Sequence, residues 1–120
     1  MSEIKFRPII ESDIREVSIL LNQLNKVDVK SIDYKKAWNN FSSNSSSNSI
    51  VGIHEKKIVA YGSIVIENKI RGQVAGHIED IVVDRDLAGK MLGVKLVKKL
   101  IEIGKSKNCY RITLFCDEKL

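Results

Sequence analysis

The spacing of apolar residues changes along the first half of the chain, and each change predicts a new element. Residues 3–8 have the pattern of a short strand, which Pro8 ends because proline lacks the N–H that a sheet ladder needs. Ser12 or Asp13 can then cap a helix that extends to about Asn25. The apolar residues of that helix recur at helical spacing and therefore share one face: Ile14, Val17, Leu20, Leu21 and Leu24.

A weaker helical pattern and a polar stretch come next. Residues 31–41 are expected to form a second helix around Ala37, Trp38 and Phe41. Residues 42–49, SSNSSSNS, contain no apolar side chain. Such a composition cannot contribute to a core, so we predict a mobile loop there.

The second half of the chain is dominated by strand-like patterns. The predicted elements are strands at 50–54, 58–67, 74–83 and 109–116, a basic loop at 68–73 and a helix at about 89–105. The long helix is amphipathic, because Gly93, Leu96 and Leu100 share one face while lysines occupy the other. The order β-α-α-β-β-β-α-β predicts a single α/β domain over residues 1–120 with a mixed sheet.

Composition and charge narrow the class of protein. The 120 residues suffice for one domain with one core, and 43% apolar with 29% charged residues is ordinary for a soluble globular protein. No apolar run approaches the roughly 20 residues that span a bilayer. The net charge of +5 fits either solubility or attraction of small anions. A nucleic-acid partner is not expected, because the aromatic residues are not interleaved with a basic run.

The cysteines and histidines suggest neither a disulfide nor a metal site. Cys109 and Cys116 are predicted on one extended strand, too far apart to pair, so reduced thiols in the cytoplasm are the simplest interpretation. No His/Cys cluster has the spacing of metal ligands. His77 could act as a base, but a histidine within a strand is more often a structural group.

The most informative stretch is 76–93, GHIEDIVVDRDLAGKMLG. A strand with two adjacent acids, Glu79 and Asp80, runs into a loop that opens the long helix. The first N–H groups of a helix lack intrahelical partners and carry partial positive charge, which makes this end an anion site. Because the acids are consecutive in a strand, they should point to opposite faces, so that at most one faces a given site.

Three segments carry a family resemblance. GHIEDIVV, LAGKMLG and CYRITLFCDEK together resemble the GNAT superfamily of acetyl-CoA-dependent N-acetyltransferases, and most closely its glucosamine-6-phosphate branch. The similarity is firm over 76–119 and loose over 4–70. It implies a GNAT-like fold and direct transfer of acetyl from acetyl-CoA to the 2-amine of glucosamine 6-phosphate, a step of UDP-N-acetylglucosamine synthesis in the cytoplasm.

The resemblance also implies roles for individual residues. The backbone of Ile81, Val82 and Val83 should pair with pantetheine, while the side chains of these residues belong to the core. The coenzyme pyrophosphate should lie over 88–93, which comprise Ala88, Gly89, Lys90, Met91, Leu92 and Gly93. No metal is implied.

The acceptor should be held by a second set of residues. Glu79, Asp80 and Asp117 are implied to contact the amino sugar or to relay the proton of its amine. Lys69 and Arg71, in the basic loop, are candidates for the phosphate. Asn25 matches a sugar-contacting position loosely.

The chain departs from the family pattern in three places. Ala88 and Met91 stand where the superfamily loop has Gln or Arg and then glycine, whereas Gly93 matches. Phe115 replaces an acid of the branch, so no role passes to it. The family continues with a helix and two strands that complete a homodimer, so the domain is expected to be C-terminally incomplete at Leu120.

Two other functions stay open from the sequence. A GNAT enzyme could acetylate a different amine, such as a protein N-terminus or lysine. A degenerate domain could bind acyl-CoA without catalysis, which the changes at Ala88 and Phe115 would favour.

Overall fold

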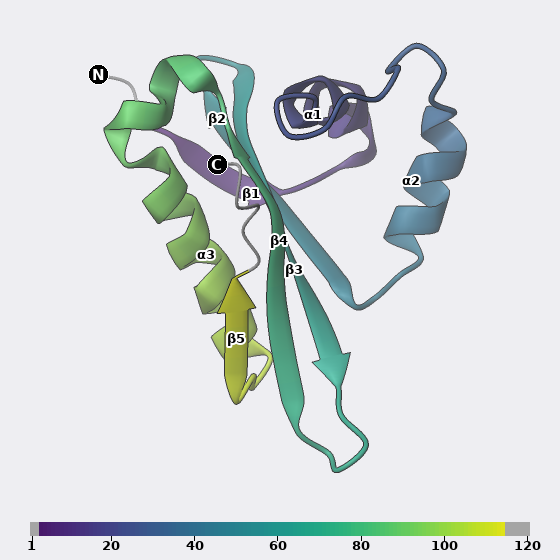
Figure 1. Ribbon diagram of the computed structural model, residues 1–120, viewed down its shortest axis with the longest axis vertical. Helices are drawn as coiled ribbons and strands as arrows, with labels where there is room; N and C mark the ends of the chain where they lie inside the picture. The colour runs from purple at the N-terminus through teal and green to yellow at the C-terminus, as the bar shows by residue number, and fades with distance from the viewer. Residues whose placement is uncertain (1–2, 115–120) are drawn as a thin grey trace.

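A five-stranded sheet in the order β1-β2-β3-β4-β5 forms the centre of the computed structural model, which describes residues 3–114, with side chains except at 88–90 (Figure 1). The strands are β1 Lys5–Pro8, β2 Ser47–His54, β3 Lys57–Asn68, β4 Val74–Val83 and β5 Arg111–Leu114. The helices are α1 Ile14–Leu21, α2 Tyr34–Ser42 and α3 Leu92–Ser106, with 3₁₀ helices η1 Glu11–Asp13 and η2 Arg85–Lys90.

The sheet is mixed, as the sequence predicts. Strands β1 to β4 pair antiparallel with their neighbours, whereas β5 pairs parallel to β4. A parallel neighbour requires a crossover connection, and η2 and α3 supply it. The coenzyme loop expected from the sequence lies at the start of this crossover.

Helices cover both faces of the sheet (Figure 1). On one face α3 packs on a cluster that includes Ile64, Ile78, Leu96 and Leu100. On the other face α1 packs on a cluster that includes Val17, Leu20, Val51, Tyr61 and Val82. We call these the α3 face and the α1/α2 face.

The salt bridge between Arg7 and Asp13 joins β1 to the start of α1. Its two hydrogen bonds measure 2.6 and 2.9 Å, and the same Asp13 carboxylate accepts the Ile10 N–H at 2.9 Å. The hydrogen bond from Arg7 is the main cause that lowers the pKa of the buried Asp13 carboxyl. The charged carboxylate therefore stabilises this corner of the fold.

The prediction of a mobile loop over 42–49 is wrong. Helix α2 continues through Ser42, a short turn follows, and Ser47 already belongs to β2. The turn is closed by hydrogen bonds from the Ser46 and Ser47 N–H groups to Asn44. Strand β3 then offers a backbone partner to each residue, so polar side chains suffice for the strand.

Three other boundaries differ from the sequence predictions. Helix α1 ends at Leu21, and turns fill the rest of the segment to Asn25. Helix α3 begins at Leu92, because Met91 has a left-handed backbone with φ 59°. Strand β5 begins at Arg111, which leaves Cys109 before it, while Cys116 lies outside the described residues.

Candidate active site

Strand β4 carries the adjacent acids Glu79 and Asp80, and its pairing with β3 is irregular there. Glu79 pairs with Ser63, whereas the next paired residue of β3, Tyr61, lies opposite Val82. Two residues of β4 therefore oppose one residue of β3, which is the arrangement of a β-bulge. Asp80 has φ 55° and supplies the left-handed residue of that bulge.

The bulge brings both acids to the α1/α2 side of the sheet. Ile78 and Ile81 both pack in the α3 face cluster, so Glu79, next to Ile78, and Asp80, next to Ile81, both face the other way. Tyr61 belongs to the α1/α2 face, and its pKa is raised chiefly by burial and additionally by the charge of Asp80. The prediction that at most one of the two acids can face a given site is therefore wrong, because it assumed an uninterrupted strand.

Three buried hydroxyl groups lie beside the acids. The Tyr61 hydroxyl is 2.8 Å from Ser49 Oγ, and Ser63 lies beside them in the register. The register aligns Ser49 with Ser63 and Ser63 with Glu79 across three strands. Sequence reasoning missed this group, although hydroxyl residues inside otherwise apolar strands were the available signal.

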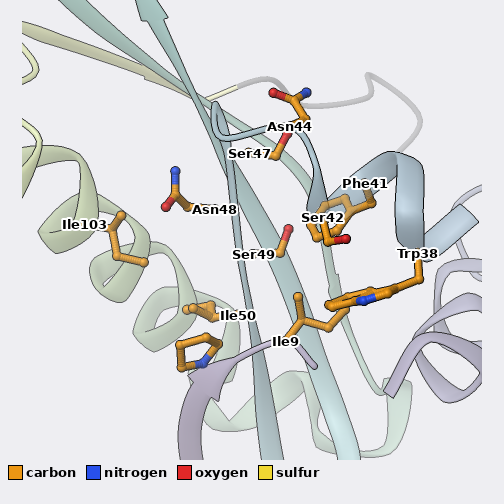
Figure 2. A pocket seen from close by; sticks show the side chains of 11 residues that line it. Ile9, Trp38, Phe41, Ser42, Asn44, Ser47, Asn48, Ser49, Ile50 and Ile103 are labelled. Carbon is orange, nitrogen blue, oxygen red and sulfur yellow. The ribbon is translucent and has the colours of Figure 1, made fainter. Parts of the chain in front are cut away.

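A pocket of about 390 Å³ begins at the same serine (Figure 2). Ser49 and Asn48 from β2 line one side, and Trp38 and Phe41 from α2 line the other. The two aromatic rings lie 5.8 Å apart between centroids. Among the described residues, those that line the pocket include no lysine or arginine, so it suits a neutral hydroxyl-bearing group better than a phosphate.

The candidate coenzyme loop lies where β4 passes into α3. Asp84 caps η2 by accepting the Asp86 N–H at 2.9 Å, and this hydrogen bond is the main cause that lowers its pKa. Ala88, Gly89 and Lys90 form the end of η2. The left-handed conformation that the superfamily glycine would adopt easily is held here by Met91, whose side chain is 64% exposed.

The first hydrogen-bond donors of α3 have no acceptor within the helix. The Met91 side chain makes no cap hydrogen bond. Leu92 is buried in the core. A Cβ at Gly93 would approach Val83 Cγ2 at 3.9 Å, an ordinary contact.

The end of β4 next to this loop contributes mainly backbone. Val82 is buried on the α1/α2 face, while Ile81 and Val83 pack partly buried on the α3 face. This confirms the expectation that their side chains are core. Among the described residues, β5 pairs with β4 only over Ala75 to Ile78, so no ladder to β5 covers the backbone of 79–83.

The structure does not bring Lys69 and Arg71 near the acids within one chain. Both lie at the tip of the β3–β4 hairpin, where the Lys69 N–H donates to the Gln73 carbonyl at 2.7 Å (Figure 1). The Lys69 ammonium pairs with Glu67 at 3.1 Å. The strand from Val74 to Glu79 alone spans about 17 Å, longer than one amino-sugar phosphate.

The remaining sequence candidates have different surroundings. Asn25 is exposed just after α1, and neighbouring Gln23 ties that segment to β4 by donating to the Val83 carbonyl at 2.9 Å. His77 bridges Thr113 at 2.9 Å and Glu67 at 2.8 Å, which fits the structural role expected for it. Asp117 lies outside the described residues, as does Phe115.

Residues 3–114 contain neither a candidate metal site nor a candidate membrane span. No group of three or more His, Cys, Asp or Glu side chains in that part of the chain could hold a metal ion. No helix there is long and apolar enough to cross a membrane.

Residues 15–119 match the family described as Acetyltransferase (GNAT) family. The chain belongs to the GNAT family. The mixed sheet with helices on both faces is therefore the GNAT-like fold that the sequence resemblance implied.

Named relatives narrow the comparison within the GNAT family. A Dictyostelium discoideum protein named glucosamine 6-phosphate N-acetyltransferase 1 is 33% identical over 96% of this chain and 77% of its own length. A rice protein named probable glucosamine 6-phosphate N-acetyltransferase 2 is 40% identical over 55% of this chain. That match spans only 41% of the rice protein.

A solved structure agrees in both fold and sequence. The crystal structure of glucosamine-6-phosphate N-acetyltransferase from Arabidopsis thaliana superposes with a TM-score of 0.84 at 34% identity. The superposition covers 98% of this chain and 85% of the Arabidopsis chain. An Agrobacterium tumefaciens putative acetyltransferase superposes with a TM-score of 0.87 at 19% identity, which supports the fold alone.

Proposed function

We propose that this GNAT domain transfers acetyl from acetyl-CoA to the 2-amine of glucosamine 6-phosphate by direct attack in a ternary complex. The observation that carries the proposal is the bulge that directs both acids of GHIEDI to one side of β4. The names of the Dictyostelium and Arabidopsis relatives support the choice of acceptor.

Acetyl-CoA would bind along the crossover between β4 and α3. Its pyrophosphate would lie over 88–93, where unpaired N–H groups and the helix dipole favour an anion. Pantetheine would pair with the backbone of 81–83, which no β5 ladder covers among the described residues. An N–H there would stabilise the oxyanion of the tetrahedral intermediate.

The acceptor would approach Glu79 and Asp80 from the α1/α2 side. Its amine nitrogen attacks the thioester carbonyl carbon, and the proton that the amine loses passes to a carboxylate, directly or through water. Collapse of the tetrahedral intermediate breaks the C–S bond, and coenzyme A leaves as a thiolate that takes a proton from solvent. Holding both substrates on one strand removes much of the entropic barrier.

Release of free thiol from acetyl-CoA tests this proposal. Release should depend on glucosamine 6-phosphate, and Glu79→Gln or Asp80→Asn should slow it about a hundredfold or more. Glu102→Gln, on α3, is the matched control and should be neutral, since Glu102 is exposed and distant in sequence from the loop. Acceptor-dependent release that survives both acid substitutions would contradict the assigned roles.

One observation favours a second candidate, acetylation of an amine without a phosphate. The cations of the basic loop lie far from Glu79 within one chain, and the pocket beside Ser49 is lined without lysine or arginine among the described residues. Comparing glucosamine 6-phosphate, glucosamine and a peptide amine in the same thiol assay separates the two. A domain that only binds acyl-CoA would release thiol with none of them.

The cellular setting is proposed on the family resemblance alone. We expect a homodimer that acts in the cytoplasm and supplies UDP-N-acetylglucosamine synthesis. Light scattering measures the oligomeric state directly. A monomer at concentrations that support full turnover would refute the dimer.

A further inference from the structure

The buried hydroxyls on the α1/α2 face are unusual for their surroundings. Ser49 and Tyr61 are each 6% exposed and Ser63 is 5% exposed, within a cluster that otherwise contains residues such as Val51 and Val82. Burying hydroxyl groups costs free energy unless they are hydrogen-bonded. Here the phenol and Ser49 satisfy each other, with Tyr61 Oη and Ser49 Oγ 2.8 Å apart.

These hydroxyls lie directly opposite the bulge. Ser63 is the partner of Glu79 on one side of the bulge, and Tyr61 is the partner of Val82 on the other. Ser49 lies level with Ser63 and Glu79 in the register, so the hydrogen bond from Tyr61 to Ser49 runs past the irregular step from the β3 side. Ser49 anchors the same phenol to β2, which is fully paired with β3 at that point.

We propose that Tyr61 is a positioning residue that fixes the bulge and thereby holds Glu79 and Asp80 together towards the acceptor. This inference rests on the proposed acetyl transfer, in which those two carboxylates meet the amine. Tyr61 acts through the acids, since it is buried on the strand that pairs with the bulge. Phenylalanine would fill the same space but leave Ser49 without this partner.

The electrostatics of the site favour an uncharged Tyr61 hydroxyl next to Glu79 and Asp80. Burial, and secondarily the Asp80 charge, raise the pKa of the Tyr61 phenol, so the hydroxyl keeps its proton at neutral pH. A neutral phenol can donate one hydrogen bond and accept others. It therefore adds polar contacts beside two carboxylates without adding a third negative charge.

The test compares Tyr61→Phe, Ser49→Ala and the double variant with the parent. Tyr34→Phe is the matched control, because its hydroxyl also makes one hydrogen bond, to the Val29 carbonyl at 2.6 Å, away from β4. For each protein, kcat, the KM for glucosamine 6-phosphate, calorimetric acetyl-CoA affinity and thermal melting are measured.

We expect Tyr61→Phe to lower kcat/KM for the sugar phosphate about tenfold, the effect of one lost hydrogen bond at the site. Acetyl-CoA affinity should change less than about twofold, because the lost hydroxyl lies at Ser49, level with Glu79, while the backbone pairing of Tyr61 with Val82 is kept. The double variant should lose little more than the worse single one, since both changes remove one interaction. Tyr34→Phe should leave the turnover of the sugar unchanged.

Other outcomes overturn the inference. A folded Tyr61→Phe with parental kinetics would show that the phenol only fills the core. A uniform loss of melting temperature, acetyl-CoA affinity and turnover would show a general structural role. A parent that releases no thiol with glucosamine 6-phosphate would defeat the proposed function, and the inference with it, before any variant is compared.

Discussion

Gly93 offers a test of the coenzyme site that leaves the fold intact. It is the second residue of α3, in the turn whose N–H groups would meet the pyrophosphate. The backbone there is not left-handed, and a Cβ would meet Val83 Cγ2 at 3.9 Å. The protein itself therefore has room for a Cβ at this position, so a binding penalty in a variant that melts normally comes from the ligand.

The substitutions Gly93→Ala and Gly93→Leu should not destabilise the fold. Replacing glycine by alanine or leucine inside a helix gains up to about 1 kcal/mol, and less in the first turn. Gly93→Ala and Gly93→Leu should thus melt at or slightly above the parental temperature. Gly104→Ala in the same helix is the contrasting control. Its Cβ would lie 2.6 Å from Ile112 Cδ1, and overpacking of this kind costs about 1–3 kcal/mol.

For acetyl-CoA binding we expect the opposite order, with Gly93→Leu impaired and Gly104→Ala normal. A leucine side chain at Gly93 would stand between the helix N–H groups and a phosphate, which removes charge-assisted hydrogen bonds worth about 1.5–3 kcal/mol each. The acetyl-CoA Kd should rise roughly tenfold to a hundredfold. Gly93→Ala should bind nearly as well as the parent, because the superfamily pattern accepts alanine there. Gly104→Ala should bind normally while folded.

Isothermal titration with acetyl-CoA, paired with thermal melts, decides the matter. The informative result is a folded Gly93→Leu protein with weak binding beside a destabilised Gly104→Ala protein with normal binding. Unchanged affinity in folded Gly93→Leu would refute the reasoning and move the pyrophosphate away from the start of α3.

Three further predictions concern the rest of the chain. Asp13→Asn should lower the free energy of unfolding by about 2 kcal/mol. Because the folded pKa of Asp13 lies below its ordinary value, the parent should keep this stability above about pH 4 and lose it as the pH falls further. Denaturation at several pH values measures this. Arg71→Ala should change the KM for glucosamine 6-phosphate less than about twofold, and a tenfold rise would show that the hairpin tip reaches an acceptor site, in a second copy of the chain. His77→Ala should keep kcat but melt earlier, since the imidazole joins Glu67 to β5; a large loss of kcat would make it catalytic.

The order of the elements was predictable because apolar periodicity records which face of each element is buried. The pattern from Ile14 to Leu24 and the stripe along α3 are of this kind. The strand at Ser47 was not, because its three polar residues join the sheet through backbone pairing with β3. The composition of a segment does not show whether its backbone pairs with a neighbouring strand.

The site was predictable in its residue types and less so in its geometry. GHIEDI identified the acids, but the bulge depends on the register against β3, which a single strand does not reveal. The basic loop adjoins β4 in sequence, yet the length of the extended strand separates Arg71 from Glu79 in space. Tyr61 and Ser49 meet across strands, so neither residue alone indicated a hydroxyl network.

The bulge also predicts how the chain tolerates the loss of a residue. In an unbroken strand, residues two apart share a side, yet here Ile78, Ile81 and Val83 lie together against α3. Asp80 is the residue that shifts this alternation. A deletion of Asp80 would leave each of those apolar side chains on its present side, whereas a deletion of Val82 would turn Val83 over. A single codon thus separates a regular strand from one that presents two neighbouring carboxylates. A lineage could lose the proposed activity by deleting that codon while its fold stays intact.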